Sequence, residues 1–281
     1  MKFIVLLMTV LLQKQTKKAG YQRKRLWFSR LLQPIPVSNM ATHYQVMVYG
    51  LLVLLPSLLL SVFIQQAHGL LGNFLAFVVQ VLLFLYILGR DDFSQRFSNY
   101  QQSWCREDYQ GAYECAQQFL DVEQKEKTHT PHELHRNVKH AILWAWFTRF
   151  FIFVFWFLVA GIGGALACLL TYWFQKETKL SWTNHLIGAV EWLPARLLAL
   201  TTALGGNFNA SFSAFMKYAL DFQADSKQVL TETAFAEDQQ EESSFQCELA
   251  SDALQETNQL MFRCAVIWLL IVAFLTVFAG I

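Results

Sequence analysis

The chain has 281 residues, of which 54% are hydrophobic and only 15% are charged, and its net charge is +1. Soluble domains carry about 25% charged residues, so this composition argues against a soluble protein and favours a membrane protein. We also expect no nucleic-acid partner, because no soluble stretch alternates basic and aromatic residues on one face.

Residues 1–45 are expected to form a basic segment in the cytoplasm or at the membrane surface. The first twelve residues resemble a signal peptide, but the basic cluster follows the apolar run and no small-residue cleavage site appears. Ten apolar residues extend only about 15 Å as a helix, half of the hydrocarbon thickness. We therefore expect a retained helix in the interface, rather than a cleaved signal or a complete span.

Two uncharged apolar stretches follow at residues 46–64 and 70–89. Each matches the roughly 20 residues that a helix needs to cross a bilayer. The first 89 residues carry eight Lys or Arg and no acid, and basic residues in short loops stay in the cytoplasm. Residues 46–89 are therefore predicted to form a transmembrane hairpin, with the amino-terminal segment cytoplasmic.

Residues 90–140 are predicted to form a soluble, cytoplasmic helical loop. An aromatic stripe from Phe93 to Trp104 recurs at intervals of three and four residues, which is typical of a helix with one buried face. Thr130 and Glu133 have the spacing of a capping box, so a new helix is expected to begin there.

Residues 141–174 are apolar except for one charge, Arg149, and glycines occupy positions 161, 163 and 164. The segment is either one long tilted helix or a helix that breaks at the glycines and returns. A break keeps residues 175–261 in the cytoplasm, whereas a single span places them outside. Acidic residues do not decide between these alternatives, because they contribute little to orientation.

Residues 175–261 combine an amphipathic stretch at 190–204 with an acidic region at 232–256. The amphipathic stretch is too short and too charged to span, so we expect it to lie in the interface or to re-enter. Residues 262–281 are predicted to contain the last transmembrane helix. The expected fold class is all-α: a polytopic helical membrane protein with four or five membrane-embedded segments, of which one is either continuous or else broken or re-entrant, plus cytoplasmic amphipathic helices.

The sequence offers little sign of chemistry. Five widely spaced cysteines without a CxxC pair are interpreted as free thiols. His132 and His135 share a helix face but lack the i, i+4 spacing of zinc hydrolases. Neither a phosphate-binding glycine loop nor a nucleophile beside a base is present. We predict no catalytic residue, no metal and no cofactor.

The candidate ligand-binding residues are Arg149, Glu191, Trp192, Pro194 and Arg196. Arg149 lies within an apolar run, and an ionised group there is costly unless it is paired or hydrated. The other four belong to the string VEWLPARLLAL, in which Trp192 and Arg196 are one turn apart. The alternatives are simpler: Arg149 reaches the headgroups, and Arg196 anchors an interfacial helix on lipid phosphate.

The order of these features resembles the AmpE family, a bacterial inner-membrane family associated with β-lactamase induction. The resemblance is sharpest at TRFF (148–151), FWFLVAGIGG (155–164) and EWLPARL (191–197), and it covers residues 135–235. AmpE proteins are similar to the CobD/CbiB group of membrane amide synthases. The acids of that group are missing here from residues 167–174 and 184–190, which argues against the synthase reaction, since phosphoryl chemistry needs charged groups that hold magnesium and phosphate.

The resemblance implies a multi-pass, inner-membrane accessory or sensory protein that is not an enzyme and acts in the response linking cell-wall turnover to β-lactamase expression. Its expected partners are membrane lipids, an anionic cell-wall fragment held by Arg149 and Arg196, and a cytosolic protein. The rival prediction is a membrane transferase or ligase related to adenosylcobinamide-phosphate synthase, with Glu191 as its acid. A third is a scaffold whose acidic region binds a cytosolic protein.

Overall fold

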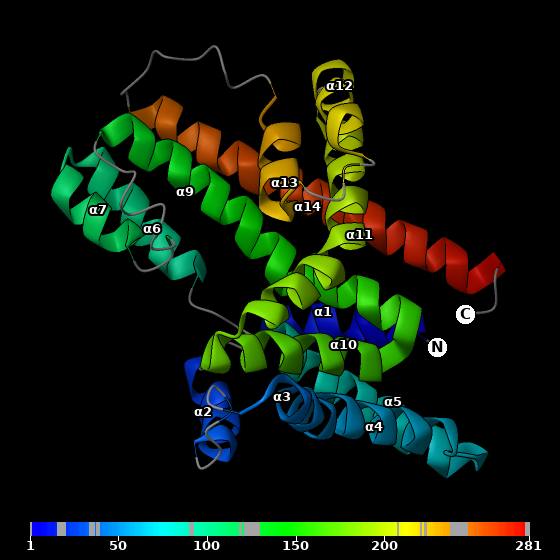
Figure 1. Cartoon of the computed structure of the whole chain (residues 1–281). Helices are drawn as coiled ribbons and strands as arrows, with labels where there is room; N and C mark the ends of the chain where they lie inside the picture. Colours follow the sequence, from blue (N-terminus) through cyan, green and yellow to red (C-terminus); the bar gives the residue numbers. More distant parts are fainter. Residues whose placement is uncertain are drawn as a thin grey trace. The chain divides into compact units, whose positions relative to one another are not determined.

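The computed structural model describes residues 2–15, 21–33, 37, 40–89, 93–117, 120, 130–206, 208–219, 221, 224–236 and 247–278. Every regular element within these ranges is helical, so the predicted all-α class is confirmed (Figure 1). Five helical stretches are long and apolar enough to cross a membrane: Thr42–Gln65, Gly69–Leu88, Glu133–Thr178, Ser181–Gly205 and Asp252–Thr276. The centre of the acidic region, residues 237–246, lies outside the described residues.

The chain divides into two compact units. The first contains Met1–Arg90, Arg149–Pro194 and Trp268–Ile281, and the second contains Asp91–Thr148 and Ala195–Ile267. We describe each unit by itself.

The first unit begins with α1 (Lys2–Gln15) and α2 (Tyr21–Leu32). Helix α3 (Thr42–Tyr49), the π-helical turn η2 (Gly50–Leu54) and α4 (Leu55–Gln65) then form one apolar stretch, and α5 (Gly69–Leu88) follows after a short turn. The wide turn η2 directly precedes Pro56, which has no N–H to donate and whose ring crowds the carbonyl four residues earlier. The first span is thus longer than the predicted residues 46–64.

Helix α10 (Ile152–Thr178) is the element on which α4 and α5 both pack. It is not continuous, because Gly161 has φ 68° and ψ −163°, a conformation that glycine adopts readily. The ribbon changes direction sharply there (Figure 1). The structure therefore adopts the broken-helix alternative of the two that the sequence left open.

Close helix packing explains a second glycine of α10. A Cβ atom at Gly163 would lie 2.6 Å from the Ser57 carbonyl oxygen of α4 and would overlap the Ser61 hydroxyl. Small residues at such crossings let helix backbones approach closely, which is how helices associate in lipid. Phe84 of α5 and Phe157 of α10 also pack together, with ring centroids 4.6 Å apart and ring planes tilted by 33°.

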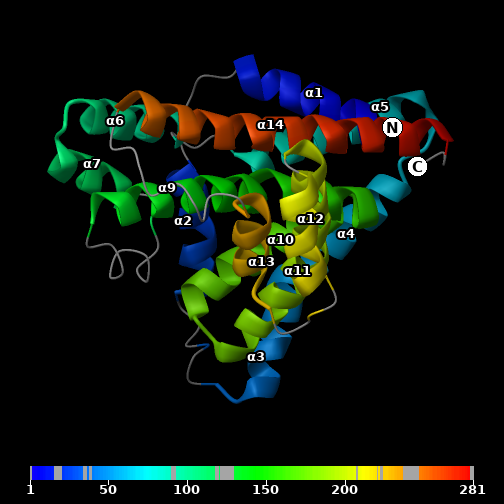
Figure 2. The same ribbon diagram turned by 90° about the horizontal axis from the view of Figure 1, so that it is seen from above.

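The second unit contains α6 (Phe93–Cys105), α7 (Tyr109–Ala116) and α9 (Pro131–Trp146), which share a hydrophobic core (Figure 2). The predicted aromatic stripe supplies two of its largest members, Tyr100 and Trp104. The predicted capping box is confirmed, since the Thr130 hydroxyl accepts from Glu133 N–H while the Glu133 carboxylate accepts from Thr130 N–H.

Three more helices complete the chain: α11 (Ser181–Gly205), α12 (Phe208–Tyr218) and α13 (Ser226–Ala234) precede α14 (Cys247–Phe278). Helix α11 extends well before the amphipathic stretch predicted at 190–204, because the residues from Ser181 onward are uncharged and helical. The whole helix is long and apolar enough to span, and the interfacial or re-entrant position of residues 190–204 stays a prediction. Helix α14 likewise begins before the predicted last span.

The prediction that all five cysteines are free thiols is wrong for one of them. Cys105 is disulfide-bonded, whereas Cys115, Cys168 and Cys264 are free. Spacing along the sequence does not report which side chains the folded helices bring within bonding distance, and this distance is the requirement for a disulfide.

Candidate functional site

A buried carboxylate on α11 is the centre of the candidate site. The side chain of Glu191 is only 5% exposed, and it accepts a hydrogen bond from the Tyr172 hydroxyl of α10. Cys168, one turn earlier on α10, is buried close to the same carboxylate. Ionisable groups inside apolar helices are rare and costly, so they mark functional sites by default.

Four polar residues of α10 lie on one face of the helix. Cys168, Thr171, Tyr172 and Gln175 recur at intervals of three, one and three residues, so they lie on one face. Thr171 hydrogen-bonds Tyr49 of α3 at 2.9 Å, and Gln175 donates to Asn184 of α11 at 3.0 Å. This face thus connects α10 to both neighbouring elements through side-chain pairs.

A third connection joins α3 to α11 directly. The Trp182 indole N–H donates to the Gln45 carboxamide oxygen at 3.0 Å, and the Tyr49 ring packs edge-on against Trp182 with centroids 5.5 Å apart. Polar groups buried among apolar helices need partners from the protein itself. The pairs around Glu191 meet this need and hold α3, α10 and α11 together.

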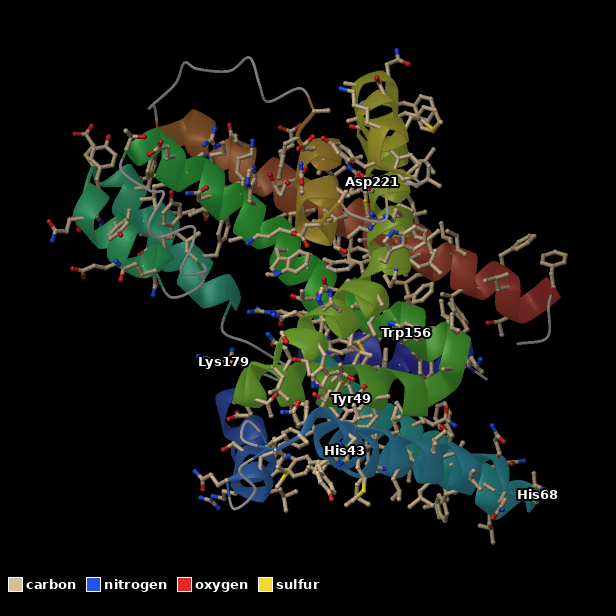
Figure 3. All side chains as sticks on the ribbon, viewed as in Figure 1. His43, Tyr49, His68, Trp156, Lys179 and Asp221 are labelled. Atoms are coloured by element: carbon tan, nitrogen blue, oxygen red, sulfur yellow. The ribbon has the colours of Figure 1, made fainter. Side chains whose placement is uncertain are left out.

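Pro194 has a specific consequence at this site. It lies inside α11, and it has no N–H to donate to the carbonyl of Val190, four residues earlier. The Trp156 indole N–H of α10 donates to that carbonyl at 3.2 Å, so a side chain replaces the missing helix bond. Figure 3 labels Trp156, which reaches Val190 from α10, and Tyr49, which reaches Thr171 from α3.

Arg196 has a different set of partners, in the second unit. Its side chain is 4% exposed, and its Nη2 donates to the carbonyl oxygens of Asp221 at 2.6 Å and Ala224 at 3.2 Å. These carbonyls belong to the connection between α12 and α13, and Figure 3 labels Asp221 there. A guanidinium that donates to two backbone carbonyls fastens this connection to α11.

The structure separates the predicted site residues. Glu191, Trp192 and Pro194 lie on the part of α11 that belongs to the first unit, and Arg196, two residues after Pro194 on the same helix, belongs to the second. Arg149 is half-buried in the π-helical turn η3 (Phe147–Phe151), a type of turn that often occurs at functional sites. The joint binding of an anion by Arg149 and Arg196 stays a prediction.

Sequence reasoning missed Tyr172 and Trp156. The stretch ACLLTYWF at 167–174 contains no acid, yet its Cys168 thiol and its Thr171 and Tyr172 hydroxyls have helical spacing in an otherwise apolar segment. That pattern was the available signal. No sequence signal connects Trp156 with Val190, because the contact depends on how two helices cross.

The arrangement suits recognition through a carboxylate and a phenol. Glu191 can accept hydrogen bonds or hold a proton, and Tyr172 can donate or accept. Among the residues that the structure describes, no group of three or more His, Cys, Asp or Glu side chains is placed to hold a metal ion.

Comparison with known proteins identifies one family. The family model described as "AmpE: Regulatory signalling modulator protein AmpE" matches residues 1–281. No curated protein and no solved structure matches the chain.

Proposed function

Because the chain belongs to the AmpE family of regulatory signalling modulators, we propose that it acts in a bacterial inner membrane as a non-enzymatic component of the response linking cell-wall stress to β-lactamase expression. We further propose that it receives its signal at Glu191 and Tyr172. The amino-terminal segment is cytoplasmic in this proposal, as the basic residues before the first span predict.

The observation that carries the proposal is the buried Glu191 carboxylate with its hydroxyl partner. A regulatory protein needs an element with two states whose populations a signal can shift. A carboxylate among apolar helices provides one, since gaining a proton or a ligand donor changes both its charge and its bond to Tyr172. Helices α10 and α11 carry the two partners, so that change alters the connection between them.

The Glu191 carboxylate accepts hydrogen bonds, and this property indicates which class of ligand it could bind. Glu191 suits a ligand with hydroxyl, amide or ammonium donors, and a cell-wall fragment would be recognised through such groups. Any acidic group of the same fragment needs a cation, and Arg149 is a half-buried cation of the same unit. Arg196 fastens the connection after α12, so its contribution to the proposed binding is structural.

The broken helix α10 supports a cytoplasmic position for residues 175–261, where a cytosolic protein partner would meet the acidic region. Reporter fusions after Glu177 and after Glu242 test this topology. Cytoplasmic reporter activity at both positions is expected. Activity of an external reporter at either position would contradict it.

The decisive experiment compares β-lactamase induction in cells that carry Glu191→Gln, Tyr172→Phe or the unchanged chain at equal membrane levels. We expect Glu191→Gln to abolish the response and Tyr172→Phe to weaken it, because each removes part of the same bond. Glu256→Gln, at an exposed position of α14, is the matched control. Normal induction with Glu191→Gln would overturn the proposal.

The rival function, a membrane transferase or ligase, has the same buried acid in its favour. Purified protein incubated with ATP and candidate amines and carboxylates would consume ATP if the rival were correct. Consumption that Glu191→Gln removes would replace the regulatory proposal. No consumption, together with lost induction in that variant, supports it.

A further inference from the structure

Helix α12 exposes an aromatic stripe that the proposed function does not use. Phe208, Phe212, Phe215 and Met216 are spaced by four, three and one residues, so they lie on one face. Phe208 is 48% and Met216 60% exposed. Phe208 stacks on Phe212 with ring centroids 4.9 Å apart, so the stripe is a continuous apolar surface.

The other two faces of α12 differ from the aromatic stripe. One packs against α13, where Ser211 is buried and the Tyr218 hydroxyl donates to Glu232 at 2.5 Å. Another carries Asn209, Ser213 and Lys217, all exposed. The contact with α13 therefore fixes the rotation of α12 and leaves both the aromatic stripe and the polar face exposed.

The stripe continues an apolar surface of the same unit. Within the second unit, the end of α11 exposes Leu197 at 38% and Leu204 at 58%. These residues belong to a helix whose apolar composition suits a membrane, and we expect its exposed leucines to face lipid. Helix α12 begins three residues after α11 ends, so the two exposed apolar sets lie close together along the chain.

We infer that α12 is an interfacial helix whose aromatic stripe inserts into the phospholipid surface at the end of α11. With 11 residues it is about 16 Å long, too short to span. Phe side chains beside a polar strip are typical of helices that lie at the boundary of headgroups and acyl chains. Exposed Lys217, on the polar face, lies where it can meet headgroup phosphate.

The test measures the accessibility of single spin labels along α12 in full-length protein, reconstituted in phosphatidylethanolamine–phosphatidylglycerol nanodiscs. Labels are placed one at a time by cysteine substitution at 208, 212 and 216, and as matched controls at 209, 213 and 217, after Ser replaces the free cysteines. We expect several-fold higher oxygen accessibility relative to a water-soluble nickel reagent on the aromatic face, and the reverse on the polar face.

Two results would overturn the inference. Equal nickel accessibility at all six positions would place α12 in water, and protection of the aromatic face from both reagents would show that protein covers it. A second measurement leaves the native cysteines in place: a photoreactive benzoylphenylalanine at position 212, with position 213 as control. Crosslinking of position 212 to phospholipid supports the inference, and crosslinking to a polypeptide contradicts it.

Discussion

Helices of the first unit carry polar side chains into apolar surroundings and pair them with side chains of other helices, as Tyr172 does with Glu191 and Tyr49 with Thr171. Helices α7 and α9 of the second unit place polar bonds at their ends. The Asp108 carboxylate accepts from Gly111 N–H at 2.9 Å, and Thr130 forms the capping box. Between α6, α7 and α9 lies a hydrophobic core.

The difference matches the two environments that the sequence predicts, lipid for the hairpin and α10 and water for residues 90–140. In lipid, helix association gains little from hydrophobicity, so close packing and polar pairs determine which helices meet. In water, burial of aromatic residues drives association, and caps satisfy the free ends of short helices. Each region should therefore respond to a different kind of substitution.

The largest effect is expected from Trp104→Ala in the second unit. Trp104 is 5% exposed and packs against Tyr100, Tyr109 and His135. Removing a buried aromatic side chain costs about 3–5 kcal/mol, measured as the free energy of unfolding in detergent by circular dichroism. Gln102→Ala, an exposed position of the same helix, should change little. A small loss with Trp104→Ala would show that burial does not hold α6, α7 and α9 together.

In the first unit, Gly163→Ala should destabilise the chain by about 1–3 kcal/mol, the range for overpacking, because its Cβ would collide with α4. Gly188→Ala in α11 is the matched control, since nothing lies within 4 Å of its Cβ position. For Gly188→Ala we expect an increase in stability of about 0.5–1 kcal/mol, because glycine in a helix is less favourable than alanine. Equal effects in thermal unfolding would contradict close packing at Gly163.

Trp156→Phe should cost about 1–2 kcal/mol, because it leaves the Val190 carbonyl without the indole donor. Pro194→Ala restores an N–H for that carbonyl, so the same Trp156 substitution should then cost much less. The double-mutant cycle measures this coupling directly. Additive effects would show that Trp156 does not compensate for the proline.

Thr130→Ala removes the side-chain acceptor of the capping box and should cost about 1 kcal/mol. Thr130→Ser keeps the hydroxyl and should retain most of the stability. Hydrogen exchange of the first turn of α9 resolves this local change. Unaltered exchange in the alanine variant would show that the cap does not stabilise this helix.

The smallest expected effect is a dependence of stability on pH in the second unit. Hydrogen bonds from Tyr218 and then Gln228 lower the pKa of the Glu232 carboxyl below its ordinary 4.5, and the bond to Glu232 raises the pKa of Tyr218. A lowered carboxyl pKa stabilises the fold above pH 4.5, and this contribution is lost as pH falls through the folded pKa. Glu232→Gln and Tyr218→Phe should each reduce the slope of the free energy of unfolding against pH in this acidic range. A retained slope in both variants would assign it to other carboxylates.

Much of the fold could be predicted from local patterns. Runs of uncharged residues predicted the helices at 46–64 and 70–89, and a Thr–Glu spacing predicted the start of α9. Glycines at 161–164 predicted the two alternatives for α10, of which the structure shows the break at Gly161. Composition did not predict the burial of Glu191 and Arg196 in α11, since charged side chains are usually exposed and the structure buries both.

By itself, the sequence determined the helical class, the apolar stretches and the caps, because hydropathy and capping depend on neighbours within a few turns. Only the tertiary structure decided that Tyr172 meets Glu191, that Trp156 meets Val190, and that Arg196 binds the carbonyls after α12. These pairs depend on where helices cross and how each is rotated. Side-chain spacing along one helix does not contain that information.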